Sequence, residues 1–269
     1  MEHFLDNIIQ SPIDMDGYVE QFEEILNNAD DICSLTQAIE SGFNFCPFNR
    51  GCKNFKEFRR NTGIHTIVWK AQMHNMNITK DEFIYYLEFL LNVLQIPKYG
   101  SISSLSYNDT KVYSILYRVI NEIGCEWVSA GQGYYIVDKN IKLEIASGIT
   151  GAVYDLNSAM YLYTHSSYTD DLIKKADVLC RVYKYIESIR AKASQYNYST
   201  LYDDISKLMD ALDIRHYPNK KATETLNGMS KEELLEWYDQ LFDLCVSLII
   251  LVDYSSKRKD IKELKGKLG

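Results

Sequence analysis

The spacing of apolar residues between positions 231 and 253 constrains the fold of this chain more than any other feature. Apolar side chains recur there at alternating gaps of four and three residues: Leu234, Tyr238, Leu241, Cys245, Leu248 and Val252. Because an α-helix turns once every 3.6 residues, this spacing places all six on one face. The pattern predicts a long helix that packs its apolar seam against other helices. Ser230 and Glu233, at the spacing of a capping box, indicate its start.

Similar apolar spacing recurs along most of the chain and predicts an all-α fold, a multi-helix bundle. We expect further helices at residues 5–10, 17–28, 32–40, 55–75, 80–94, 108–123, 150–163, 170–196 and 200–212. Thr79 and Glu82 form a second capping box before the helix at 80–94. The chain has 46% hydrophobic residues but only four prolines and 13 glycines, which argues against a turn-rich sandwich and against disorder.

One small β-hairpin is expected at residues 125–137. Two short runs of strand-forming residues flank a turn that contains Gly131 and Gly133. A helix followed by a hairpin is also typical of winged-helix modules, but this hairpin carries little positive charge. A hairpin that packs over helices is therefore favoured above a DNA-binding wing. We divide the chain into an N-terminal helical region (1–97), a helix-plus-hairpin module (98–148) and a C-terminal helical bundle (149–269).

The charge and the termini limit the classes of function. A net charge of −8 argues against general coating of nucleic acid, because such proteins displace counterions from phosphates with a basic face. A local basic site remains compatible with this charge. The N-terminus lacks the pattern of a signal peptide, and the longest apolar segment, Leu241–Val252, is too short to span a bilayer. We expect a cytoplasmic protein that has no contact with membranes.

Two of the six cysteines and two histidines form a candidate zinc pattern. The six cysteines are scattered through the chain, so reduced thiols are expected. Cys46, Cys52, His65 and His74 follow the spacing C-x5-C-x12-H-x8-H, whereas structural zinc ligands usually come in closer pairs. Ordinary buried thiols and packed histidines are favoured, and we expect no metal and no cofactor.

The main candidates for catalytic or phosphate-binding side chains lie in the segment Met209–Lys221. It contains Arg215, His216, Asn219, Lys220 and Lys221 in a loop that follows a predicted helix. Arginine can hold a phosphate through its planar fork, and histidine can transfer protons near neutral pH. The sequence has no phosphate-binding glycine loop, nucleophile elbow, H-E-x-x-H helix or dinucleotide-binding turn. The common hydrolase, kinase and dehydrogenase classes are therefore disfavoured.

The C-terminal part resembles helical domains of bacterial abortive-infection proteins of the HEPN type (higher eukaryotes and prokaryotes nucleotide-binding). The resemblance covers less than half of the chain and rests on Tyr163, Asp170–Lys175, Ile186–Arg190, Leu212–Asn219 and Glu232–Tyr238. It implies a four-helix bundle that forms a homodimer and takes part in phage defence. In such families an arginine and a histidine, spaced as R-x4-6-H, cleave RNA across the dimer.

The spacing of Arg215 and His216 departs from that motif, because the two residues are adjacent and no histidine follows four to six residues later. Adjacent side chains on a helix do not converge on one phosphate, although in a loop they can. Arg60 and His65 have the family spacing and form a second candidate pair, but they lie near the start of the helix predicted at 55–75.

Two interpretations of Arg215–Lys221 are open. In the catalytic one, His216 is the general acid or base, Arg215 holds the phosphate, and Asn219, Lys220 and Lys221 contact RNA. In the structural one, which is favoured, Arg215 caps the preceding helix and pairs with Asp210 or Asp213.

Two functions follow from these interpretations. The first is an abortive-infection or toxin-like protein that acts on RNA, as a metal-independent endoribonuclease or an RNA binder. The alternative is a non-catalytic helical module of a defence system that binds a protein partner. An arginine at position 215 that is occupied by structural hydrogen bonds, together with an exposed apolar patch, would favour the alternative.

Overall fold

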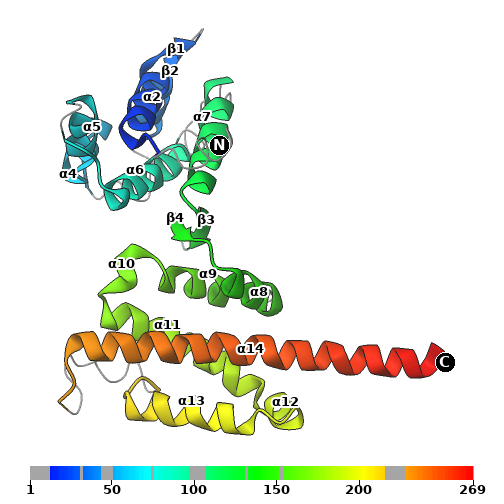
Figure 1. The fold of residues 1–269 in the computed structure, drawn as a ribbon. Helices are drawn as coiled ribbons and strands as arrows, with labels where there is room; N and C mark the ends of the chain where they lie inside the picture. Colours follow the sequence, from blue (N-terminus) through cyan, green and yellow to red (C-terminus); the bar gives the residue numbers. More distant parts are fainter. Residues whose placement is uncertain are drawn as a thin grey trace, which may run out of the picture. The chain divides into compact units, whose positions relative to one another are not determined.

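A computed structural model describes residues 13–30, 33–43, 51–73, 76–96, 107–130, 133–151, 154–215 and 228–268 (Figure 1). The chain forms two compact units, Met1–Ile136 and Val137–Gly269. The boundary lies inside a β-strand and differs from the three regions expected from the sequence. The helix that follows residue 106 and the first strand of the hairpin share the apolar core of the first unit.

The described part of the first unit consists of short helices and two small strand pairs. Its helices are α2 (Met15–Asn27), α3 (Leu35–Gly42), α4 (Phe55–Asn61), α5 (Ile64–Gln72), α6 (Lys80–Val93) and α7 (Tyr107–Glu122). Strands β1 (Ala29–Asp30) and β2 (Cys33–Ser34) pair antiparallel, and β3 (Cys125–Ala130) pairs with β4 (Gly133–Asp138). The all-α fold class with a small β-hairpin is confirmed. The pair β1–β2 was not predicted.

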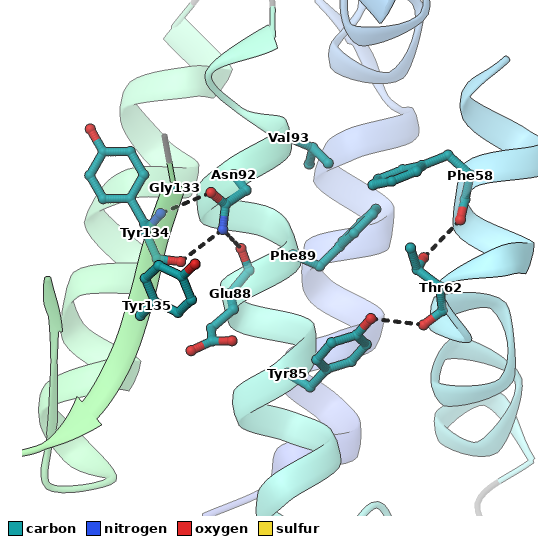
Figure 2. A pocket seen from close by; sticks show the side chains of 10 residues that line it. All are labelled: Phe58, Thr62, Tyr85, Glu88, Phe89, Asn92, Val93, Gly133, Tyr134 and Tyr135. Carbon is teal, nitrogen blue, oxygen red and sulfur yellow. Dashed lines mark hydrogen bonds between the residues drawn. The ribbon is translucent and has the colours of Figure 1, made fainter. Parts of the chain in front are cut away.

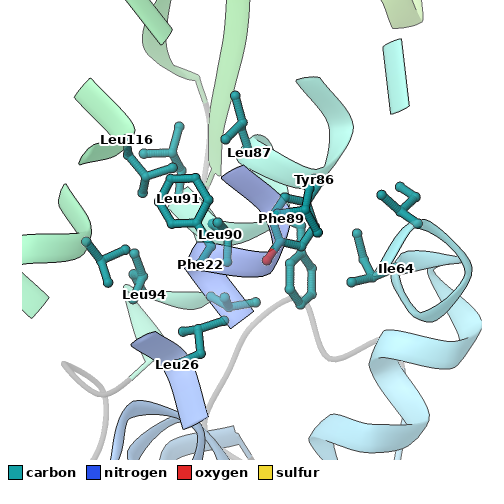
Figure 3. Packing of buried hydrophobic residues seen from close by; sticks show 14 of the residues in the cluster. Phe22, Leu26, Ile64, Tyr86, Leu87, Phe89, Leu90, Leu91, Leu94 and Leu116 are labelled. Carbon is teal, nitrogen blue, oxygen red and sulfur yellow. The ribbon is translucent and has the colours of Figure 1, made fainter. Parts of the chain in front are cut away.

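Helix α6 is the centre of the first core. Its buried residues contact residues of α2, α5 and α7, and Figure 3 shows Leu90 and Leu91 among Phe22, Leu26 and Leu116. The predicted capping box forms at its start: Thr79 Oγ1 accepts the N–H of Glu82, and the Glu82 carboxylate accepts the N–H of Thr79. This cap satisfies backbone donors that no helical carbonyl can reach.

The single helix expected at 55–75 is wrong, because the chain breaks between α4 and α5. Gly63 adopts a φ of 77°, a left-handed conformation that side chains with a Cβ rarely take. The Thr62 hydroxyl donates to the Phe58 carbonyl at the end of α4. The apolar spacing runs through the break, so periodicity alone joined two helices into one.

The predicted hairpin is present and packs on α6. Only two residues separate β3 from β4, a connection that suits antiparallel strands. The amide of Asn92 donates to the Tyr134 carbonyl and accepts the Tyr134 N–H, both at 2.9 Å. The Glu88 carboxylate accepts the N–H of Ile136 at 2.6 Å. Side chains of α6 thus satisfy backbone groups of β4 as a neighbouring strand would.

The second unit is a helical bundle built around one long helix. Its described helices are α8 (Ile141–Thr150), α9 (Tyr154–Tyr163), α10 (Ser166–Thr169), α11 (Leu172–Ser188), α12 (Arg190–Gln195), α13 (Ser199–Ala211) and α14 (Lys231–Leu268). Helix α14 packs against α8, α11, α12 and α13. All six residues of the predicted seam, from Leu234 to Val252, are buried, which confirms that pattern.

Three predicted boundaries in this unit are wrong. The helix expected at 150–163 begins at Tyr154, and Thr150 instead ends α8, which was not predicted. The helix expected at 170–196 is divided at Ile189 into α11 and α12, and Asp171 caps its start by accepting the Lys174 N–H. The last helix does not end at Asp253 but continues to Leu268. Figure 1 shows its C-terminal part extending beyond α8, α11 and α12. The described helices include none that is long and apolar enough to cross a membrane.

A buried cation sits between α11 and α14. The Lys175 side chain is 5% exposed, and its Nζ donates to Asp239 Oδ1 at 2.6 Å. The same Nζ lies 4.9 Å from the ring centroid of Tyr163, which stacks on Phe242 with centroids 3.9 Å apart. The ring face and the carboxylate both compensate a charge that is removed from water. Asp239, in contrast, is about half exposed.

This asymmetry predicts unequal effects of removing either partner. Asp239→Asn should lower the free energy of unfolding of the second unit by about 1–2 kcal/mol, because Lys175 then stays buried without a carboxylate. Lys175→Met should cost less than about 1 kcal/mol, because Asp239 remains hydrated. Urea unfolding, with hydrogen exchange of α11 to report this unit, measures both. A larger loss for Lys175→Met would contradict the argument.

The buried tyrosine Tyr238 predicts how stability depends on pH. Burial raises the pKa of Tyr238 to about 12. In the unfolded chain a tyrosine ionises near its ordinary pKa of about 10, so its stabilising contribution is full below pH 10 and is lost as the pH rises towards 12. Tyr238→Phe should therefore reduce the loss of stability per pH unit in this window by up to about 1.4 kcal/mol. Identical slopes for the two proteins in urea titrations would refute this.

Candidate functional site

Arg215 lies in a tight turn that ends α13. Asp213 adopts a φ of 54°, and the N–H groups of Ile214 and Arg215 both donate to the Met209 carbonyl. A left-handed residue just beyond a helix turns the chain back so that the last carbonyls find donors. The turn fixes where the Arg215 side chain begins, next to the last turn of α13.

The Arg215 guanidinium is held by two carboxylates and one aromatic ring. Nη1 donates to both oxygens of Asp210 at 3.2 and 3.1 Å, and Nη2 donates to Glu187 Oε1 at 3.4 Å. Its Cζ lies 5.6 Å from the ring centroid of Tyr183. The hydrogen bonds to Asp210, followed by the nearby Tyr183, raise the pKa of Arg215. This guanidinium connects α13 to α11.

The structural interpretation of Arg215 is borne out in its pairing with Asp210. The partners Glu187 and Tyr183, which come from α11, were not predicted. His216, Asn219, Lys220 and Lys221 lie outside the described residues, so the proposed catalytic pair and RNA contacts stay predictions. The described part of this corner has one arginine between two carboxylates, which is a poor docking place for a phosphate.

The second candidate pair, Arg60 and His65, is divided by the break at Gly63. Arg60 is in the last turn of α4, His65 is in the first turn of α5, and both side chains are exposed. The neighbouring Arg59 instead turns inward, and its Nη2 donates to the buried Glu23 at 2.8 Å. The family spacing therefore falls across two short helices rather than on one helix of a bundle.

The zinc pattern is only partly visible. Cys52 is half-buried just before α4, and its sulfur accepts the amide N–H of Asn61, the last residue of α4, at 3.5 Å. Cys46 and His74 lie outside the described residues. Within the described ranges, no group of three or more His, Cys, Asp and Glu side chains could hold a metal ion.

A pocket of about 290 Å³ lies between α4, α6 and β4 (Figure 2). Ten described residues line it: Phe58, Thr62, Tyr85, Glu88, Phe89, Asn92, Val93, Gly133, Tyr134 and Tyr135. The rings of Phe58 and Phe89 stand 6.2 Å apart with an interplanar angle of 26°. The Tyr85 hydroxyl donates to the Thr62 carbonyl at 3.0 Å, which ties α6 to the end of α4.

Sequence reasoning missed this pocket, although one signal was present. Tyr85, Glu88, Phe89 and Asn92 are spaced i, i+3, i+4 and i+7, which places them on one face of α6. An aromatic and polar face beside a buried one is unusual enough to suggest a second contact surface. The strand that completes the pocket lies 40 residues away in sequence and could not be assigned from the helix alone.

A groove of about 400 Å³ runs between α8 and α14 in the second unit. It is lined by Glu144, Ile145, Gly148, Ile149, Asp253 and Lys257. On α14 the same helix face continues as Tyr254, Ile261 and Leu264, each more than half exposed. On α8, Ile141 and Ile145 are also exposed. Together these side chains form an apolar surface, which we call the α8–α14 face.

Comparisons with known proteins add no assignment. No protein-family model, no curated protein and no solved structure matches this chain.

The contacts of Arg215 predict a small, salt-dependent contribution to stability. Arg215→Ala should lower the free energy of unfolding slightly, because it leaves Asp210 and Glu187 near each other without a cation. The loss should shrink in high salt, which screens exposed charges. Arg60→Ala, an exposed arginine of the other unit, is the control. Urea unfolding at two salt concentrations measures the effect, and an Arg215→Ala protein as stable as wild type in low salt would contradict it.

Proposed function

We propose that this chain is a non-catalytic helical interaction protein that binds an acidic, amphipathic helix of a partner on its α8–α14 face. The apolar stripe on the projecting part of α14 is the observation that carries the proposal. Tyr254, Ile261 and Leu264 are seven and three residues apart, which fits the heptad spacing with which one helix packs against another. Exposed apolar side chains in one continuous stripe are typical of a partner-binding surface.

The charge of the projecting part of α14 indicates that its partner is acidic. Residues 253–268 contain six Lys or Arg and three Asp or Glu, a net charge of +3. The whole chain carries −8, so the remainder carries −11. Two such basic helices would repel each other, whereas acidic side chains beside an apolar stripe would complement Arg258, Lys262 and Lys265. The preferred occupant is therefore an acidic helix along the projecting part of α14, rather than a second copy of this helix.

The function that acts on RNA is the competing proposal. It depends on His216, Asn219, Lys220 and Lys221, which lie outside the described residues, and on Arg215. Because Asp210 and Glu187 hold the Arg215 guanidinium, a phosphate would have to displace one of these carboxylates. The pairing supports the interaction protein above an endoribonuclease, and the phage-defence role and the homodimer implied by the resemblance stay proposals.

A designed peptide pair tests the interaction directly. We expect a helical peptide with leucine heptads and glutamate flanks to bind the full chain. The same peptide with lysine flanks should bind at least about tenfold more weakly, because it meets a basic surface. Ile261→Gln with Leu264→Gln should weaken the glutamate peptide by about tenfold or more, since the stripe is lost. Lys259→Gln, on the opposite face of α14, is the matched control. Fluorescence anisotropy measures all combinations.

Three outcomes would overturn the proposal. Equal binding of both peptides, or no effect of the stripe variant, would exclude an acidic helix as the occupant. A concentration-dependent dimer that the stripe variant abolishes, measured by light scattering, would assign the face to a second copy. Cleavage of RNA by wild type but not by Arg215→Ala or His216→Ala would establish the endoribonuclease instead.

A further inference from the structure

The polar side chains that α6 contributes to the pocket of the first unit are engaged by the protein itself. The Asn92 amide donates to the Tyr134 carbonyl and accepts the Tyr134 N–H. The Tyr85 hydroxyl donates to the Thr62 carbonyl, and the Glu88 carboxylate accepts a backbone N–H of β4. These bonds attach α4 and β4 to α6, so the frame of the pocket is fixed before any ligand binds.

This bonding disfavours a charged ligand. An ion that enters a pocket loses hydration, and a protein group must compensate that loss. Here a compensating bond to a side chain of α6 would compete with the bonds that hold the frame. A neutral ring system loses little hydration and needs no such bond, so its burial is favourable. The pocket therefore favours a neutral, mostly apolar molecule.

Aromatic side chains form much of the wall. The rings of Phe58 and Phe89 stack, and Figure 2 shows the Tyr85 ring on the side of α4 and the Tyr135 ring on the side of β4. Aromatic rings attract one another through their faces and edges, in addition to the effect of the area that they bury. A flat aromatic ligand therefore gains more from this wall than a saturated molecule of the same size.

The volume of the pocket limits the size of the ligand. The pocket holds about 290 Å³, whereas an apolar cavity of about 150 Å³ accommodates one benzene molecule. The pocket also lies at the lower end of the range for small-molecule sites. A volume near that of two benzene cavities suits two fused rings.

We propose that this pocket binds a neutral, flat molecule of two fused aromatic rings, held by ring contacts rather than by charge. All the described residues that line it belong to the first unit, whereas the α8–α14 face lies in the second. The proposal is therefore independent of the interaction function.

Four probes test the charge and the flatness of the ligand. Hydroxymethylindole is neutral, aminomethylindole is a cation and indole carboxylate is an anion on the same fused rings, whereas cyclooctanol is neutral but saturated. The full chain should bind hydroxymethylindole about tenfold or more tightly than either charged probe, and about fivefold or more tightly than cyclooctanol. Calorimetric titration gives the affinities, and NMR shifts of α6 and β4 resonances locate the site. A charged probe or cyclooctanol that binds as tightly as hydroxymethylindole, or shifts confined to other residues, would overturn the proposal.

Two substitutions at the half-exposed Tyr85 separate its ring from its hydroxyl. Tyr85→Leu removes the ring, so hydroxymethylindole should bind about threefold or more weakly and cyclooctanol about equally. Tyr85→Phe keeps the ring and loses only the bond to Thr62, so the affinity should stay within about twofold of wild type. Tyr117→Leu, at an exposed tyrosine of α7 that does not line the pocket, is the control and should change nothing.

Wild-type affinity in a folded Tyr85→Leu protein, or an equal loss in Tyr85→Phe, would refute the ring contact. If Tyr85→Leu does not fold, the four probes on the wild-type chain decide.

Discussion

The second unit depends on the burial of one helix, α14, on more than one of its sides. Its seam from Leu234 to Val252 faces the bundle, while α8 packs along the face that leads to Lys257. A helix that is apolar on several sides is stable only where neighbours cover it. From Lys257 onward the described side chains of α14 are exposed, but the helix continues to Leu268. The apolar stripe there is a continuation of core packing beyond the core, which explains why it has the spacing of a packing surface.

In the first unit, α6 also contacts its neighbours with more than one face, but the two faces make different kinds of contact. One face of α6 fills the core, with Tyr86, Leu87 and Leu90 fully buried. The adjacent face carries Glu88 and Asn92, which bind backbone groups of β4 and hold the hairpin at a fixed distance. The pocket is therefore the space left where a strand is attached to a helix by polar side chains rather than by close packing. Its shape follows from the length of those side chains.

The fold was predictable where the local pattern and the tertiary structure agree, as in the seam of α14, both capping boxes and the hairpin. The break at Gly63 had a local signal that the apolar periodicity concealed. The break at Ile189 had no such signal, because the sequence has no glycine or proline near it. The pairing of Arg215 with Asp210 could be predicted, because the two residues are five positions apart in the sequence. The contact of Arg215 with Glu187 could not be predicted, because only the packing of α13 on α11 brings Glu187 near.

Two regions of the second unit carry charge of opposite sign. At the end of α13, Arg215 between Asp210 and Glu187 leaves the described surface with a negative balance. The projecting part of α14 carries the opposite sign. An acidic molecule that approaches the described surface is repelled from the first region and attracted to the second, where it also meets apolar side chains. Electrostatics thus favours α14 over Arg215 as the place of contact, and the apolar stripe makes that contact one for a helix rather than for a bare phosphate backbone.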